Sequence, residues 1–99
     1  MAVALHIHLK SKPGKEAGVE KLLQDILACV QQEPATAPWF AVRMNETVFG
    51  IFETFPDEAG RQAHLNGKGA ALLKERQEEL LVRPARIDML DVTLTKPGG

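Results

Sequence analysis

The first hydrophobic pattern of this chain is an alternation of large apolar residues with small or polar ones over positions 3–10. Its apolar side is made of Val3, Leu5, Ile7 and Leu9. Because successive side chains of a strand point to opposite faces, a period of two predicts a β-strand with one strongly apolar face. A proline and a glycine at positions 13 and 14 end it.

A helical period replaces the alternation over residues 15–32. Apolar side chains recur there every three or four positions, at Val19, Leu22, Leu23, Ile26, Leu27 and Val30. This spacing predicts an amphipathic helix with one buried stripe. Glu16 stands near the start, where a negative charge suits the helix dipole, and Pro34 ends the helix.

Residues 38–44 and 47–55 are two runs rich in aromatic and β-branched side chains, joined by the polar connector Asn45-Glu46. This arrangement predicts a β-hairpin. Both strands carry apolar residues on both faces. Trp39 and Phe40, for example, are adjacent in the sequence and therefore point to opposite faces.

The remainder of the chain predicts two helical segments and a last strand. Asp57 follows a proline and is suited to cap a short helix over residues 58–66. Glycines at positions 67 and 69 separate this helix from a second one over residues 70–82, and residues 85–95 alternate again. The order is therefore β-α-β-β-α-β, with the second helical region split. This order is typical of the ferredoxin-like α+β fold, a four-stranded antiparallel sheet with helices on one face.

One domain spans residues 1–99 in this interpretation, with residues 96–99 as a flexible tail. The helices can cover only one face of the sheet. The hairpin strands and much of the last strand are nevertheless apolar on both faces, and 99 residues leave no element to cover the second face. We therefore expect a homodimer.

The composition is that of a globular protein, with 44% hydrophobic and 25% charged residues. A formal net charge of −1 indicates neither a nucleic acid nor an anionic membrane as partner. The single cysteine excludes an intramolecular disulfide, and no apolar run approaches the roughly 20 residues that span a bilayer. The first residues do not form a signal peptide, so we expect a cytoplasmic protein.

Short motifs of this chain resemble a known family. An apolar strand ends in Glu53-Thr54-Phe55, Asp57 and Ala59 stand at a helix start, and His64 follows that alanine by five positions. Lys12-Pro13-Gly14-Lys15 precedes a Glu-rich amphipathic helix. With the order of elements, these residues resemble the antibiotic biosynthesis monooxygenase family over nearly the whole chain.

The resemblance implies a ferredoxin-like subunit that pairs sheet to sheet with a second copy into a dimeric α/β barrel. It also implies a substrate cleft between the sheet and the helices of each subunit. Family members include oxygenases of aromatic polyketide anthrones and quinol oxygenases, which use molecular oxygen without metal or flavin, and heme-degrading oxygenases. We accordingly expect no cofactor and no metal.

His64 is the first candidate for a catalytic residue, because it matches the helix histidine of the family. Arg61 and Lys68 stand one turn away on either side. Two basic neighbours disfavour a protonated imidazole, so we expect a neutral His64 that acts as a base or a donor near a phenol. The alternative is a surface or capping histidine.

The heme-degrading branch of the family pairs this histidine, as an axial heme ligand, with a Trp at the end of the third strand and an Asn on the first strand. This chain has Phe55 at the former position and no Asn in residues 3–10. Heme binding or heme degradation is therefore the less favoured activity.

The candidates for substrate binding are Trp39, Phe49, Phe55 and Arg43. Trp39 is the only tryptophan, and it either forms an aromatic wall for a planar ligand or packs in the core or a dimer interface. The oxygenases of polyketide anthrones are thought to steer a phenolate with Tyr, Trp and Asn. The chain contains no Tyr, so that set is incomplete here.

Glu53 is the second candidate for catalysis. It alternates with apolar residues on its strand, where a carboxylate can serve as a base or pair with Arg43 on the neighbouring strand, and we favour the ion pair. His6 and His8 share one side of the first strand, at a spacing compatible with metal ligation. No third ligand is apparent in the sequence, so we interpret them as dimer-interface residues.

Together these features predict a cofactor-independent monooxygenase, an oxidoreductase that acts on a small planar aromatic such as a quinol or a polyketide phenol. The apolar cleft would bind the phenol, and a base such as His64 would help to form the phenolate. The electron-rich ring would then reduce molecular oxygen directly. The alternative is a non-catalytic dimeric barrel that binds a small hydrophobic ligand.

Overall fold

The computed structural model describes residues 2–36 and 38–96. The elements follow in the order β1 (Val3–Lys10), α1 (Glu16–Val30), β2 (Trp39–Arg43), β3 (Val48–Phe55), α2 (Glu58–Leu65), α3 (Lys68–Leu80) and β4 (Arg86–Asp91). The predicted βαββαβ order is confirmed, including the split of the second helical region. Apart from Lys96, the tail expected at residues 96–99 lies outside the described residues.

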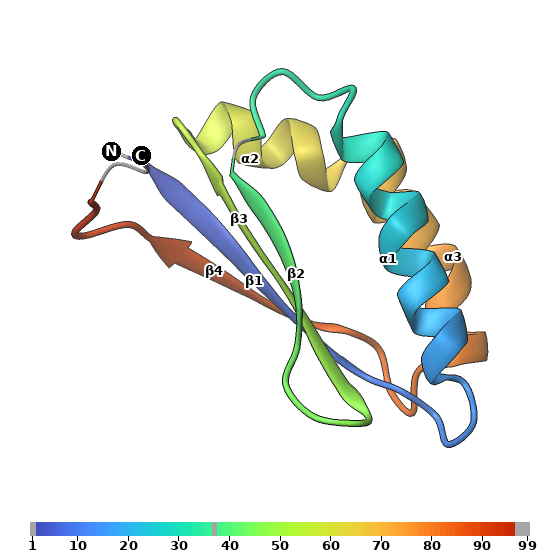
Figure 1. The fold of residues 1–99 in the computed structure, drawn as a ribbon. Coiled ribbons are helices and arrows are strands. Elements are labelled where there is room, and N and C mark those ends of the chain that lie inside the picture. The colour runs from blue at the N-terminus through green and yellow to red at the C-terminus, as the bar shows by residue number, and fades with distance from the viewer. Residues whose placement is uncertain (1, 37, 97–99) are drawn as a thin grey trace.

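The four strands form one antiparallel sheet in the order β2-β3-β1-β4. All three helices lie on one side of this sheet, with α1 and α3 side by side and α2 across one end of the strands (Figure 1). The chain therefore has the ferredoxin-like α+β fold that the sequence predicts.

The core lies between the sheet and the helices. α1 buries the stripe Val19, Leu22, Leu23, Ile26 and Val30. These side chains pack against the apolar positions of the two central strands, among them Ile7, Leu9, Phe49 and Ile51. Leu27, which the sequence pattern places in the stripe, is 38% exposed because it lies at the flank of the buried face.

The ends of the elements differ from the sequence-based expectations by a few residues. Asp57 caps α2 as predicted, because its side chain accepts a hydrogen bond of 2.9 Å from the backbone N–H of Gly60. Gly69, expected to break the helix, instead lies inside α3. A Cβ atom at Gly69 would lie 3.5 Å from Cγ2 of Ile26, so this glycine is where α3 comes close to α1.

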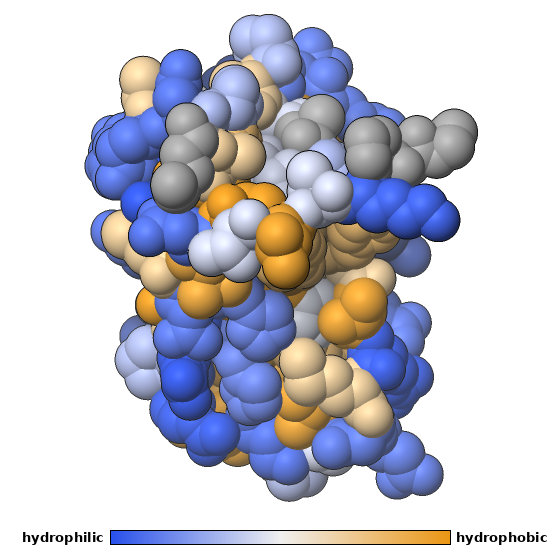
Figure 2. All heavy atoms as spheres, turned by 90° about the vertical axis from the view of Figure 1, so that its left-hand side faces the viewer, coloured by the Kyte–Doolittle hydropathy of each residue, from blue (hydrophilic) through white to orange (hydrophobic). Residues whose placement is uncertain are grey.

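The face of the sheet opposite the helices remains uncovered in the single chain. Its exposed apolar side chains are Phe40, Val42, Met44, Phe52 and Leu90. Figure 2 shows this face, with hydrophobic residues along its middle and hydrophilic residues around them. The sheet is thus apolar on both faces, as predicted. None of the helices in the described residues is long and apolar enough to cross a membrane.

Candidate functional site

His64 lies in the last turn of α2, with 4% of its side chain exposed. Its Nδ1 atom lies 2.6 Å from Oε1 of Glu33, which belongs to the loop after α1. Its Nε2 atom lies 2.9 Å from Oε1 of Glu53, which lies on β3. The imidazole is therefore held between two carboxylates from distant parts of the chain, and we call these three residues the Glu33–His64–Glu53 cluster.

The cluster favours the charged form of the histidine. Burial alone lowers the pKa of His64, but the contacts with Glu53 and Glu33 outweigh this effect and raise the pKa above its ordinary value. This direction is opposite to the one expected from the basic residues one turn away. Those positions are near in sequence, whereas the two carboxylates reach the ring through the tertiary structure.

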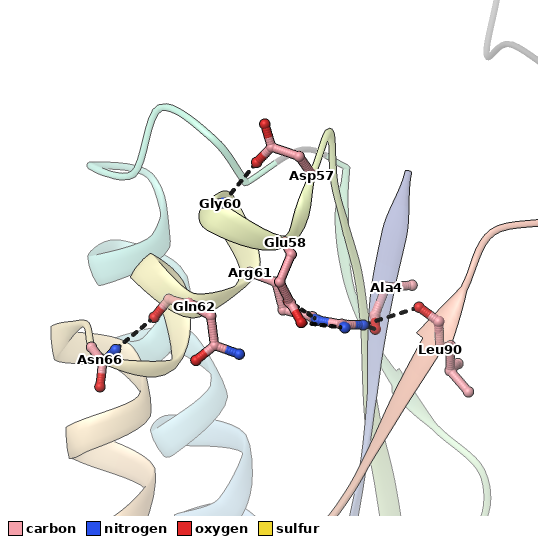
Figure 3. A network of polar contacts seen from close by, with 8 residues as sticks. All are labelled: Ala4, Asp57, Glu58, Gly60, Arg61, Gln62, Asn66 and Leu90. Atoms are coloured by element: carbon pink, nitrogen blue, oxygen red, sulfur yellow. Dashed lines mark hydrogen bonds and ion pairs between the residues drawn. The ribbon is translucent and has the colours of Figure 1, made fainter. Parts of the chain in front are cut away.

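Arg61 lies one turn before His64 on α2. Its side chain contacts the sheet (Figure 3). Its Nη1 atom donates hydrogen bonds of 3.1 Å to the backbone carbonyls of Ala4 on β1 and Leu90 on β4. Its Nε and Nη2 atoms bind both carboxylate oxygens of Glu58 at 2.7 and 2.9 Å. Arg61 thereby fixes α2 against two strands, and with it the position of His64.

A pocket of about 220 Å³ lies beside the cluster, between the sheet and α3. Its apolar lining includes Ile7, Ile26, Ile51, Leu65, Leu73 and Ile87. The polar side chains that line it are Trp39, Glu53, His64, Lys74 and Gln77. An apolar pocket with a few converging polar groups is typical of a small-molecule site.

Two side chains of this lining have buried polar atoms without a hydrogen-bond partner among the described residues. Glu53 is fully buried, and its contact with His64 has the distance of an ion pair but not the alignment of a hydrogen bond. The indole Nε1 of Trp39 is the other unpaired group. Because buried polar groups in proteins are nearly always paired, these atoms are candidates for contacts with a ligand or an ordered water molecule.

The structure brings three of the sequence-predicted site residues together: Trp39, Glu53 and His64. Phe55 lies next to the pocket, with its ring centroid 5.4 Å from that of His64. The remaining two, Phe49 and Arg43, lie outside the pocket near the other end of β3.

The prediction of an ion pair between Arg43 and Glu53 is wrong. The register of the hairpin places Arg43 opposite Phe49, whose ring centroid lies 5.0 Å from the guanidinium. Arg43 instead donates a hydrogen bond of 3.0 Å to Glu20 of α1. Sequence reasoning also missed Glu33, because it follows the helix in a polar stretch where no local pattern distinguishes it.

The geometry of the histidines bears on metal and heme binding. His6 lies on the open face of the sheet, with its Nδ1 3.8 Å from Oδ2 of Asp88. The described residues contain no group of three side chains that could hold a metal ion. Both ring nitrogens of His64 contact carboxylates, so heme ligation by this residue requires the displacement of one of them.

Comparisons with known proteins agree with this architecture. No family model and no curated protein matches the chain. The NE2512 protein of Nitrosomonas europaea, whose function is unknown, is 40% identical, with a TM-score of 0.92 over 99% of this chain and 96% of that one. The chain belongs to the family of this Nitrosomonas protein.

Two other solved structures show the same fold at lower identity. One is a candidate antibiotic biosynthesis monooxygenase from Caulobacter crescentus, 21% identical, with a TM-score of 0.81 over 94% of this chain and 91% of that one. The other is SnoaB, a cofactor-independent oxygenase from Streptomyces nogalater, 13% identical, with a TM-score of 0.81 over 98% of each chain. The resemblance to the antibiotic biosynthesis monooxygenase family is thereby confirmed in the fold.

Proposed function

We propose that the chain is a cofactor-independent oxygenase that acts on a small planar aromatic substrate, a quinol or a polyketide phenol, with molecular oxygen. The observation that carries this proposal is the Glu33–His64–Glu53 cluster at the wall of an apolar pocket. The description of SnoaB, which shares the fold, as a cofactor-independent oxygenase supports it.

The cluster suits the formation of a phenolate. In the proposed mechanism the substrate hydroxyl transfers its proton to the buried carboxylate of Glu53. The imidazolium of His64 then lies close to the new negative charge and stabilises it, an effect that the apolar lining strengthens. Glu33 contacts the opposite ring nitrogen, so it orients the imidazole and keeps it charged.

The phenolate then supplies the electrons that reduce oxygen. When a phenol becomes a quinone, one atom of molecular oxygen bonds to a ring carbon as the second carbonyl oxygen. The other atom leaves as water, together with the two hydrogen atoms that the substrate loses. The substrate provides all four electrons, so the reaction needs no external reductant. The part of the protein is to exclude water and to hold the ring in place.

The proposed oxygenase is a homodimer. The open face of the sheet exposes apolar residues of three strands, including Phe40, Phe52 and Leu90. We propose that two chains cover these faces by pairing sheet to sheet, which leaves the pocket on the helical side of each sheet accessible. Light scattering should then give about twice 10.9 kDa at micromolar concentration.

Oxygen uptake with a panel of quinols and anthrones tests the activity. We expect uptake above background for at least one compound, and a loss of about 10²-fold or more in Glu53→Gln, the effect of removing a general base. His64→Asn should also lower the rate, because it removes the positive charge. Glu79→Gln is the matched control, since this exposed glutamate on α3 lies outside the pocket. Equal rates in wild type and Glu53→Gln would contradict the mechanism.

The alternative is a non-catalytic dimeric barrel that binds a small hydrophobic ligand. The absence of Tyr from the chain favours it, since the anthrone oxygenases are thought to steer the phenolate partly with Tyr. The two functions differ in turnover. A compound that binds in the pocket under air and is recovered unchanged, without oxygen uptake, would favour the binding protein.

A further inference from the structure

The indole N–H of Trp39 is a buried donor without an acceptor among the described residues. Trp39 begins β2 and lines the pocket next to the cluster. An indole nitrogen can only donate a hydrogen bond, so only an acceptor atom can satisfy it. Buried indole N–H groups usually have such a partner.

The residue that carries this donor is paired across the hairpin with a residue that carries a buried acceptor. Trp39 and Glu53 are direct partners in the register of β2 and β3, so both side chains leave the same face of the sheet. Directly opposite Cβ atoms in an antiparallel pair are about 4.5–5.5 Å apart. The Oε2 atom of Glu53 is likewise buried and unpaired. Both residues line the pocket, so one ligand there lies next to both side chains.

The size of the pocket limits the ligand that makes these two contacts. A protein cavity of about 150 Å³ binds benzene. The pocket of about 220 Å³ therefore holds one ring with substituents or two fused rings, and a larger compound such as an anthrone would extend from its open side. A ligand with an acceptor oxygen next to the indole N–H gains a hydrogen bond that an analogue without this oxygen does not make.

We infer that Trp39 is a specificity-determining residue that selects small aromatic compounds carrying two oxygen substituents. The hydroxyl group of the compound donates to Glu53, and its second oxygen, such as a carbonyl, accepts a hydrogen bond from Nε1 of Trp39. This inference rests on the proposed function, because it assumes that the hydroxyl lies at the Glu33–His64–Glu53 cluster. It adds a second point of recognition, which rejects analogues that lack the acceptor.

A matched pair of ligands tests this inference. Para-hydroxyacetophenone carries a hydroxyl and a carbonyl, and para-ethylphenol replaces the carbonyl oxygen with hydrogen atoms. Their affinities are measured by calorimetry for the wild type and for Trp39→Phe, which keeps an aromatic ring and removes the donor. The meta isomers of both compounds are measured in the same way, because the separation of the two oxygens differs between the isomers.

In the wild type we expect at least one ketone to bind about three- to tenfold tighter than its ethyl analogue, the effect of one hydrogen bond. The ratio should fall by the same factor in Trp39→Phe. Any difference in acidity or hydrophobicity between the two ligands affects both proteins alike and cancels in this comparison. Circular dichroism and the affinity for the ethyl analogue control for the fold of the variant.

A second measurement needs no variant. Because the chain has one tryptophan, its ¹⁵N-labelled form gives a single indole N–H resonance. We expect the hydroxyacetophenone to move this resonance downfield, as hydrogen bonding does, and the ethylphenol to leave its proton shift nearly unchanged. An equal shift with both ligands, or an equal affinity ratio in both proteins, would overturn the role of Trp39 and leave the proposed oxygenase intact. If no phenol of either kind binds the wild type, the inference about Trp39 is wrong, and the oxygen-uptake assay decides the proposed oxygenase separately.

Discussion

Replacement of Glu33 by Gln tests whether the two carboxylates hold a proton on His64. Glutamine keeps the shape and an oxygen acceptor at the position that now lies 2.6 Å from Nδ1, but removes the negative charge. A hydrogen bond to a charged group contributes about 1.5–3 kcal/mol, and a neutral one about 0.5–1.5 kcal/mol. The free energy of unfolding should therefore fall by about 1–2 kcal/mol wherever His64 is protonated.

The loss of stability in Glu33→Gln should depend on pH in a defined direction. The pKa of His64 is raised in the folded state, because the two carboxylates outweigh the effect of burial. A raised pKa adds stability that is fully present below the unfolded value of 6.5 and is lost as the pH rises through the folded value. The difference between wild type and Glu33→Gln should thus be largest near about pH 5.5 and shrink as the pH rises further.

Urea unfolding followed by circular dichroism, at one fixed protein concentration, measures these free energies from about pH 5.5 to 9. The matched control is Glu79→Gln, whose exposed carboxylate lies 3.5 Å from Arg76 and should contribute little at any pH. In a His64→Asn background the effect of Glu33→Gln should lose its pH dependence. A loss that stays constant or grows with pH would refute the protonated cluster.

Three further outcomes follow from other parts of the structure. Phe52→Glu places a charge in the middle of the open sheet face. The mass from light scattering should then fall to that of one chain, and a mass of two chains would contradict the proposed interface. Asp57→Ala removes the cap of α2 and should lower the free energy of unfolding by about 0.5–2 kcal/mol, measured by urea titration, with Asp57→Asn close to wild type. A lysine in Arg61→Lys cannot reproduce the forked contacts with Glu58 and two backbone carbonyls. This variant should therefore lower the midpoint of thermal unfolding more than Glu58→Gln does. The reverse order would show that the carbonyl contacts contribute little to stability.

The hairpin illustrates what could be predicted for the site. Its two strands and its polar connector were evident from the sequence, but a two-residue connector gives the wrong register. Pairing outward from Asn45 and Glu46 would place Arg43 opposite Val48 and Trp39 opposite Phe52. In the structure the turn is one residue longer, so Arg43 lies opposite Phe49 and Trp39 opposite Glu53. The prediction of an Arg43–Glu53 ion pair failed because it relied on charge without the register.

Glu33 and Arg61 are different, because no local signal identifies their partners. Glu33 is 31 positions from His64, and its contact exists only because α2 packs near the loop that follows α1. Arg61 and His64 are one turn apart on α2, yet Arg61 contacts the carbonyls of β1 and β4. The spacing in the sequence places Arg61 and His64 close together, whereas the packing of α2 gives their side chains different partners.

The sequence by itself determined the order of the elements, the N-cap at Asp57, the buried stripe of α1 and the apolar character of both sheet faces. These features depend on local periodicity and on residues that terminate helices and strands, so they can be recognised in a single chain. The tertiary structure alone decided the direction of the pKa shift of His64 and the pairing of Arg61. It also left Trp39 and Glu53 with unpaired polar atoms at the pocket. Protonation and hydrogen bonding depend on distances between groups far apart in sequence, and folding sets those distances.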